Sequence, residues 1–286
     1  MSLTIIKGTI VSAPALGQLD ITPGGYLIAR DGVIQGVYPA LPEQYAGAPV
    51  EDYGDDLILQ SFADLHLHGA QYPMLGMGMD LPLLDWLNAY AFPTEARFAD
   101  TGYAREIYRR LARELITNGT TRVCMFSSLH TDATLILMEE LEKAGVTGYV
   151  GKVNMDRNAA PGVLEETTEE SKRETLRWLD ACGDFHLVKP MLTPRFTPSC
   201  TDELMAWLGK LAAERELPVQ SHLSENDREI AWVRQLHPGC AQYWETYAKY
   251  GLWNSRTLMA HCVWSDQRER AAMREAGVTV VHCPDS

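Results

Sequence analysis

The first sixty residues carry the short, interrupted apolar runs of a β-structure. Residues 26–29 and 33–37 are mostly apolar, and they flank the pair Asp31 and Gly32. An Asp-Gly pair between two apolar runs predicts a tight β-hairpin, because glycine adopts the positive φ angle that such a turn needs. Several prolines and glycines interrupt the pattern after this hairpin. We therefore predict a small β-domain at the start of the chain.

Beyond residue 60 the pattern changes to short apolar runs that alternate with amphipathic segments. Apolar runs typical of strands occupy residues 123–126, 147–153, 186–192, 218–223, 257–262 and 278–283. Segments typical of helices occupy residues 131–145, 201–215, 229–236 and 266–276, the first with Thr131 as its expected N-cap. Such alternation predicts an α/β fold with a parallel sheet, but it does not separate an open sheet from a closed barrel. Residues 1–60 and 61–286 are thus expected to form two domains.

Composition and charge narrow the class of protein. With 286 residues, 46% of them hydrophobic, the chain can bury a large core. A formal net charge of -13 would repel a phosphate backbone, so nucleic acid is not an expected partner. The six cysteines are scattered without a C-x-x-C pair, which favours free thiols in a reducing compartment. Without a signal peptide or an apolar run of about 18 residues, we expect a cytoplasmic protein that does not enter a membrane.

His66 and His68 stand two residues apart in the motif D-L-H-L-H, shortly after an apolar run. Residues two apart on a strand face the same side, so two imidazoles would meet at one place. Imidazole is a common metal ligand, and two at a fixed spacing begin a metal site. One such pair among eight histidines can also arise by chance, so the motif alone leaves both interpretations open.

Three later histidines favour the metal interpretation. His222, His261 and His282 each stand at the end of a predicted strand. In parallel α/β folds the carboxyl ends of the strands form the active face, whereas histidines of a packed core have no reason to share that position. We therefore predict a metal site at this face.

Glu225, Arg195 and Phe196 are weaker candidates when each is considered alone. Glu225 follows His222 by three residues and could move protons at a metal-activated water, but acids near helix N-termini are also common for structural reasons. Arg195 and Phe196 follow another predicted strand, where they could bind a flat heterocycle and stack on it. Their positions alone favour a solvated loop arginine and a packing phenylalanine.

Four stretches of the sequence match a known family. They are D-L-H-L-H-G-A-Q-Y-P from Asp64, the segment 84–95 with W-L-N and F-P-T-E, Pro194-Arg195-Phe196, and H-L-S-E-N from His222 followed by His261-Cys262 and His282-Cys283-Pro284. On these residues the chain resembles the guanine deaminase branch of the amidohydrolase superfamily. The H-x-H pair indicates only the superfamily, whereas segments 84–95 and 194–196 indicate the guanine branch.

The resemblance implies a TIM-like (β/α)8 metal-dependent hydrolase barrel with a small N-terminal β-sandwich domain. It implies one divalent ion, Zn2+ with Fe2+ as the alternative, held by His66, His68, His222 and His261. It implies Glu225 as the catalytic proton shuttle and a purine-binding set of Gln71, Arg195 and Phe196. The implied reaction, a step of purine metabolism, is hydrolytic deamination of guanine to xanthine and ammonia by metal-activated water. A cytoplasmic homodimer is implied as well.

The resemblance is incomplete at the C-terminal end of the sequence. The family's last metal ligand is an Asp at the end of the eighth barrel strand, whereas residues 283–286 correspond to the end of the seventh. Asp285 is not that ligand by position. A barrel open at this point would expose a sheet edge and apolar helix faces, so we expect the natural chain to continue beyond Ser286.

Two other functions remain open from the sequence. Another amidohydrolase, acting on a different amino- or chloro-heterocycle, would keep the histidines and Glu225 but need other pocket groups than Gln71 and Arg195. A non-catalytic, truncated amidohydrolase-like module is the second alternative, although a scaffold has no need of the four ligand histidines and Glu225. A cytidine-type zinc deaminase is disfavoured because H-x-E and P-C-x-x-C are absent, and a serine hydrolase because G-x-S-x-G is absent.

Overall fold

The computed structural model describes residues 2–284, in two compact units, Met1–Phe62 and Ala63–Ser286. The first unit contains one four-stranded sheet in the order β3-β2-β1-β4. Its elements are β1 (Leu3–Ala15), β2 (Gln18–Arg30), β3 (Val33–Tyr38), the short 3-10 turn η1 (Glu43–Tyr45) and β4 (Glu51–Ile58). β2 pairs antiparallel with β1 and with β3, whereas β4 runs parallel to β1. Ile5, Ile10 and Ile28 are buried in this unit.

The predicted hairpin is confirmed at the turn between β2 and β3. Asp31 has a φ angle of 51° and Gly32 one of 79°, so both central residues take the left-handed conformation. A two-residue turn of this kind matches the twist of the flanking strands, and it sets Arg30 opposite Val33. The described residues of this unit form a single sheet, so a β-sandwich stays a prediction.

The second unit is built on strands that neighbour one another in chain order. They are β5 (Phe62–His68), β6 (Thr120–Phe126), β7 (Thr147–Gly151), β8 (Val153–Asn154), β9 (Val188–Pro190), β10 (Thr193–Pro194), β11 (Val219–Leu223), β12 (Thr257–His261) and β13 (Thr279–Val281). One sheet has the order β5-β6-β7-β9, a second has the order β11-β12-β13, and β8 pairs with β10. Every pairing with a known register among β6 to β13 is parallel. The predicted α/β fold with a parallel sheet is therefore confirmed.

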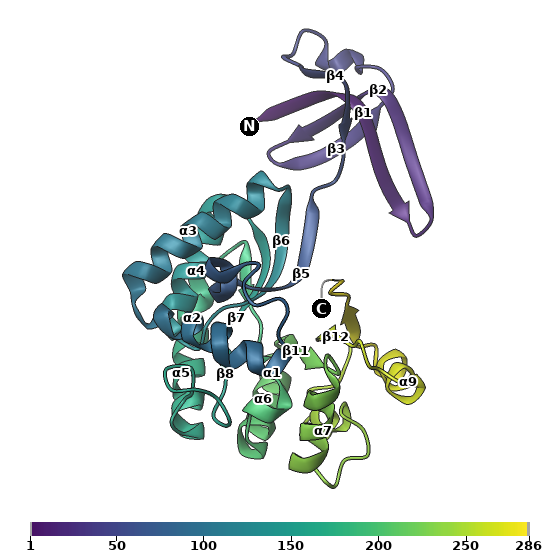
Figure 1. Ribbon diagram of the computed structural model, residues 1–286. Helices are drawn as coiled ribbons and strands as arrows, with labels where there is room; N and C mark the ends of the chain where they lie inside the picture. The colour runs from purple at the N-terminus through teal and green to yellow at the C-terminus, as the bar shows by residue number, and fades with distance from the viewer. Residues whose placement is uncertain (1, 285–286) are drawn as a thin grey trace. The chain divides into compact units, whose positions relative to one another are not determined.

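Helices follow the strands and lie on the outside of the second unit (Figure 1). The longer ones are α3 (Thr101–Thr117), α4 (Thr131–Ala144), α5 (Thr168–Ala181), α6 (Asp202–Glu214), α7 (Asp227–Leu236) and α9 (Gln267–Ala276). Short helical segments are η2 (Gly69–Met74), α1 (Leu83–Trp86), the π-helical turn η3 (Leu87–Ala91), α2 (Phe92–Ala96), η4 (Arg97–Ala99), η5 (Cys182–Asp184), η6 (Thr197–Ser199) and α8 (Glu245–Ala248). Between helices and strands lies a core that includes the fully buried Tyr108, Leu137 and Trp178. Within residues 2–284, no helix is both long and apolar enough to cross a membrane.

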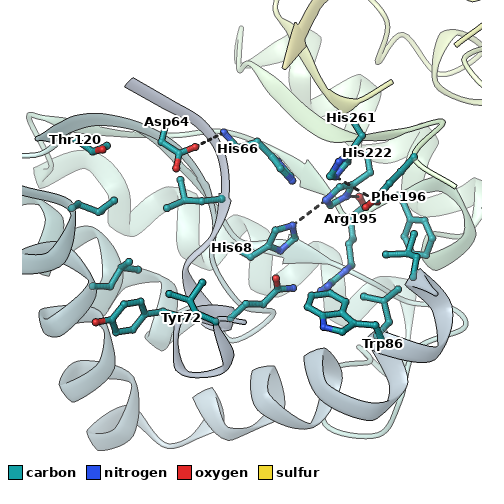
Figure 2. Close-up of a pocket in the computed structure, with 18 of the residues that line it drawn as sticks. Asp64, His66, His68, Tyr72, Trp86, Thr120, Arg195, Phe196, His222 and His261 are labelled. Carbon is teal, nitrogen blue, oxygen red and sulfur yellow. Dashed lines mark hydrogen bonds and ion pairs between the residues drawn. The ribbon is translucent and has the colours of Figure 1, made fainter. Parts of the chain in front are cut away.

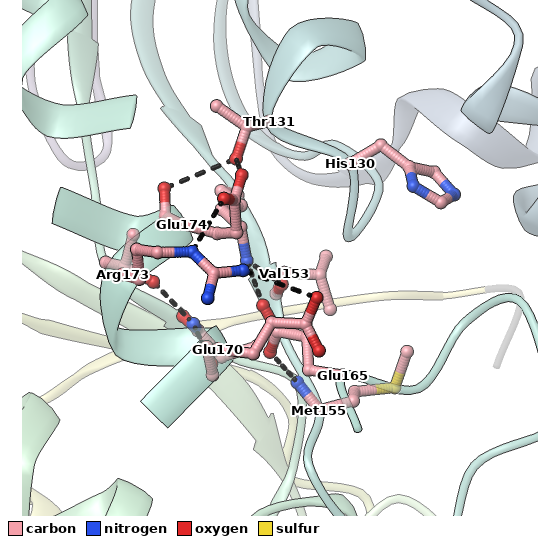
Figure 3. Close-up of polar contacts among 12 residues, drawn as sticks. His130, Thr131, Val153, Met155, Glu165, Glu170, Arg173 and Glu174 are labelled. Atoms are coloured by element: carbon pink, nitrogen blue, oxygen red, sulfur yellow. Dashed lines mark hydrogen bonds and ion pairs between the residues drawn. The ribbon is translucent and has the colours of Figure 1, made fainter. Parts of the chain in front are cut away.

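The start of α4 differs from the prediction by one residue. His130 occupies the N-cap position without a side-chain cap, and Thr131 is already helical. The Thr131 hydroxyl instead donates to the carboxylate of Glu174 on α5 at 2.9 Å (Figure 3). The prediction of Thr131 as N-cap is wrong because a contact between two helices competes with the local cap, and local sequence does not reveal such contacts. The predicted end at Gly145 is confirmed, since Gly145 has the left-handed φ of 78°.

Three of the apolar runs form shorter strands than the sequence predicts. Run 147–153 divides into β7 and β8, run 186–192 contributes only the residues of β9, and run 278–283 only those of β13. Pro190 ends β9 and Pro194 ends β10. Proline has no N–H to donate to a ladder, so regular pairing stops where it occurs.

Gly209 in α6 marks a very close approach of this helix to a neighbouring loop. A Cβ atom there would lie 1.7 Å from the carbonyl oxygen of Tyr250, a backbone atom that cannot rotate away. We expect Gly209→Ala to lower the free energy of unfolding by about 3 kcal/mol, measured by urea denaturation. Gly183→Ala is the matched control, because a Cβ there meets no atom within 4 Å. Equal effects of the two substitutions would contradict this account of Gly209.

Candidate metal and substrate site

Four histidines meet where three strands end. His66 and His68 belong to β5, His222 is the next-to-last residue of β11, and His261 is the last residue of β12. Ring nitrogens of His66, His222 and His261 lie within 4.8 Å of one another. The Nε2 atoms of His68 and His222 are 3.0 Å apart, and Figure 2 shows the four labelled rings turned toward one another. The structure thus brings together the four histidines that the resemblance implies as ligands.

The hydrogen bonds of these rings fit a divalent metal ion. His222 Nδ1 donates to the carbonyl oxygen of Arg195 at 2.5 Å, which leaves its Nε2 as a lone pair toward His68. Two imidazole nitrogens that each lay about 2.0–2.1 Å from a shared zinc ion would be about 3 Å apart, close to the spacing seen here. His68 Nδ1 and His261 Nδ1 are buried and find no hydrogen-bond partner within residues 2–284. The lone pair of His222 Nε2 can accept from an N–H of His68 or bind a cation that the two rings share.

Burial keeps the four imidazoles neutral. Removal from water lowers the pKa of His66 to about 3 and that of His261 to about 4. Burial also holds the pKa values of His68 and His222 well below the usual value. A neutral imidazole has a free lone pair, so the cluster offers metal ligands at neutral pH.

Glu225 lies beside this cluster. Its Oε2 atom is 3.5 Å from Nε2 of His261, and its side chain is 18% exposed. Burial, reinforced by the neighbouring Glu229 carboxylate, raises the pKa of Glu225 to about 8. A carboxyl group with a pKa near neutrality can both take up and release a proton during a reaction.

The sequence left open that Glu225 is an acid that stabilises a helix N-terminus. In the structure, Glu229 has that role. Glu229 and Asn226 form a capping box at the start of α7, and the Glu229 carboxylate accepts from the backbone N–H of Glu225 at 3.0 Å. Glu225 itself precedes the cap and faces the histidines. The backbone is strained here, since Ser224 has a φ of 49° and His261 one of 73°. Such non-glycine residues cluster at functional sites, where the surrounding structure holds them.

A cavity of about 460 Å³ opens onto the histidines. Gln71, Arg195 and Phe196 line it together with Glu225. Its walls are largely apolar and include Leu67, Tyr72, Leu75, Leu83, Trp86 and Leu87. Figure 2 shows Arg195 between the histidine cluster and Trp86. A volume of this size with a few polar groups fits a small, flat heterocyclic molecule.

The sequence gives no role to Glu95, which the structure places beside Arg195. The two side chains form a bidentate ion pair, with Arg195 Nη1 and Nη2 at 2.5 and 3.0 Å from the Glu95 carboxylate oxygens. Gln71 Nε2 also donates to Glu95, at 2.8 Å. Glu95 stands in the F-P-T-E segment that carries the resemblance, but local pattern does not predict a contact across 100 residues.

Within the described part of the chain, no hydrogen bond, ion pair or ring contact joins His282 to the cluster. It follows β13 by one residue and is exposed. The prediction that it ends a strand is therefore wrong by one residue. Asp285, which the sequence excludes as a ligand, lies outside the described residues.

Comparison with known proteins places the chain in a family. A family model described as the amidohydrolase family matches residues 57–286. The chain belongs to the amidohydrolase family. This agrees with the resemblance carried by the H-x-H motif and the later histidines. Metal dependence is typical of amidohydrolases, and the histidine cluster is the group that could bind the metal.

Several amidohydrolases named guanine deaminase are similar to the chain. The protein of Dictyostelium discoideum is 38% identical, over 99% of this chain and 67% of its own length. That of Rattus norvegicus is 44% identical, over 81% of this chain and 51% of its own length. A crystal structure of guanine deaminase from C. acetobutylicum, with guanine bound in its active site, has a TM-score of 0.95 at 44% identity, covering 99% of this chain and 68% of that one. The chain thus spans about half to two thirds of the length of these relatives.

Proposed function

We propose that this chain carries the catalytic site of a guanine deaminase, which converts guanine and water to xanthine and ammonia. The observation that carries the proposal is the four-histidine cluster with Glu225, which opens onto a cavity also lined by Arg195 and Gln71. Similarity to proteins named guanine deaminase, one of them with bound guanine, supports the same substrate.

One divalent ion is the proposed cofactor, with Zn2+ favoured and Fe2+ as the alternative. Its proposed ligands are His66, His68, His222 and His261, supported by their short separations and neutral rings. Such an ion lowers the pKa of water and so supplies a nucleophile at neutral pH. Metal content of the purified protein, measured by plasma emission spectroscopy, tests both the identity of the ion and its stoichiometry.

The residues of the chain have separate proposed roles in the reaction. The water oxygen forms a bond with C2 of guanine, and the bond from C2 to the exocyclic amine breaks. Glu225 takes one proton of the water at Oε2 and passes it to the ring nitrogen. It then takes the remaining proton from the oxygen now bonded to C2 and gives it to the departing amine. Arg195 and Gln71 hold the polar edge of the base, and Phe196 lines the pocket beside the ring.

We further propose that the second unit is part of a TIM-like (β/α)8 barrel and that the first is part of a β-sandwich, with a domain boundary near residue 60. The chain-order arrangement of the strands, with histidines at their carboxyl ends, supports the barrel. A cytoplasmic location is supported by the six free cysteines. A homodimer is expected from the resemblance, and sedimentation velocity tests it.

The direct test uses the natural full-length protein loaded with zinc. Guanine is followed by ultraviolet absorbance while ammonia is assayed in the same sample. Equimolar xanthine and ammonia would establish the function. A folded, metal-replete protein that leaves guanine unchanged would overturn it, and other amino- or chloro-heterocycles would be assayed next. A protein that purifies without stoichiometric metal would instead favour the non-catalytic module.

Arg195→Ala is expected to lower kcat/KM for guanine by about 100- to 1000-fold, because the base loses a charged donor in a buried site. Steady-state kinetics on variants checked for folding by circular dichroism measure the effect. Arg110→Ala is the matched control, since Arg110 is an exposed residue of α3. Nearly unchanged turnover after Arg195→Ala would favour an amidohydrolase that acts on a different heterocycle.

A further inference from the structure

Glu95 is a buried acid that contacts both proposed base-binding side chains. It is 1% exposed, and it is not among the described residues that line the cavity. Its carboxylate accepts from Arg195 through two nitrogens and from Gln71 Nε2. We propose that Glu95 is a positioning residue that fixes the donor and acceptor pattern of the base pocket, an inference that rests on the proposed function.

The contact with Glu95 decides which way the Gln71 amide faces. An ionised carboxylate can only accept hydrogen bonds, so the amide must turn its NH2 group toward Glu95. The carbonyl oxygen Oε1 lies on the other branch of the same amide, and Gln71 lines the cavity. Gln71 therefore offers the cavity an acceptor, although a free glutamine can offer either group.

The Arg195 guanidinium contacts both the Glu95 carboxylate and the aromatic ring of Phe92. Its guanidinium carbon lies 5.2 Å from the ring centroid of Phe92. Phe92 and Glu95 are three residues apart on α2, a spacing that places both on one face of a helix. The π-helical turn η3 (Leu87–Ala91) directly precedes α2. Arg195 has five N–H donors, and those not used by Glu95 stay available to an acceptor on the substrate.

A pocket with one fixed acceptor and one fixed donor selects between purine edges. A 6-oxopurine presents an N–H donor at N1 beside a carbonyl acceptor at C6, which complements this pattern. A 6-aminopurine presents the reverse, with an acceptor at N1 and a donor at C6. A buried polar group that is left unpaired costs a large factor in rate, so the lactam edge is preferred. Glu95 maintains the preference because it prevents Gln71 from turning over.

The test compares guanine with 2,6-diaminopurine, which keeps the 2-amino group and replaces the 6-oxo group. In the unaltered full-length protein, ammonia release from 2,6-diaminopurine is expected to have a kcat/KM at least about 1000-fold below that of guanine. Glu95→Gln should lower kcat/KM for guanine by about 100-fold and raise the diaminopurine-to-guanine ratio by at least about 10-fold. Glu95→Asp keeps the carboxylate, so it should recover part of the kcat/KM for guanine and part of the preference for guanine over 2,6-diaminopurine. Glu106→Gln, at an exposed acid of α3, is the matched control and should change neither value.

Each outcome bears on the proposal. Guanine turnover with an unchanged substrate ratio in folded Glu95→Gln would overturn the role of Glu95 and leave the proposed function intact. No guanine turnover by the unaltered protein would overturn the proposed function itself. If neither Glu95 variant folds, the two substrates are compared in the unaltered protein alone. A kcat/KM for 2,6-diaminopurine within about tenfold of that for guanine would contradict a fixed donor and acceptor pattern in the pocket. A uniform loss on both substrates would indicate that Glu95 only supports the fold.

Discussion

Glu225→Gln is expected to lower kcat for guanine by about 1000- to 10,000-fold, while the protein keeps its fold and its metal. The glutamine amide has nearly the same size as the carboxyl group, but it cannot carry a proton between water and the leaving amine. Glu225 touches His261 at 3.5 Å and is not needed for the capping box of α7, which Glu229 completes. The loss should therefore appear in kcat with little change in thermal stability or metal content.

Asp227→Asn is the matched control for this prediction. Asp227 is an exposed acid two residues further along the chain, at the start of α7. The substitution removes one carboxylate from the same region, and Asp227 does not line the cavity. We therefore expect kcat to stay within about twofold of that of the unaltered protein. Stopped-flow or steady-state absorbance at saturating guanine gives kcat for both variants. If Glu225→Gln retained more than a tenth of the activity, another group would have to move the proton.

His66→Ala is expected to remove both the metal and the activity. The His66 ring lies within 5.2 Å of its three partner rings, counted between ring centroids, so its loss removes one side of the cluster. Removal of one of the proposed ligands weakens binding sharply, because the ion would lose one of its metal–nitrogen bonds. We expect less than about a tenth of the metal of the unaltered protein after dialysis, and turnover below detection.

His186→Ala removes the same residue type from an exposed position and is the control for metal content. Treatment of the unaltered protein with a chelator should reproduce the inactivity of His66→Ala, and added Zn2+ should restore turnover only in the unaltered protein. Retention of one metal ion per chain by His66→Ala would mean that the ion is held elsewhere. Activity that survives complete removal of metal would contradict the proposed role of the ion.

Arg195 links the histidine cluster to the base pocket. Its carbonyl oxygen accepts from His222 Nδ1, whereas its guanidinium pairs with Glu95. The hydroxyl of Ser221 donates to the carbonyl oxygen of Pro194 at 2.7 Å, which fixes the backbone of this turn against β11. A shift of the turn would therefore change the orientation of a candidate metal ligand and of a base-binding group together. This coupling gives a physical reason for Arg195 and Phe196 to follow β10 directly.

Local pattern predicted most of the elements and the class of chemistry. Asp31 and Gly32 predicted their hairpin, because the positive φ angles of that turn depend on those two residues alone. The alternation of apolar runs and amphipathic segments predicted the parallel α/β unit, since each element buries one face. The ends of apolar runs predicted that histidines gather at one face, but they included His282 as well, and only the resemblance implied the set of His66, His68, His222 and His261. Thr131 was misplaced because its hydroxyl contacts Glu174 on another helix.

The sequence by itself determined which elements form, at which end of the strands the histidines gather, and through its motifs, which family the chain belongs to. Only the tertiary structure decided that Glu95 holds Arg195 and Gln71, that Glu229 and not Glu225 caps α7, and that His282 stays outside the cluster. The physical reason is the separation along the chain of the residues that interact. Turns, caps and periodicity depend on residues within a few positions, whereas a buried ion pair across 100 residues depends on how separate elements pack.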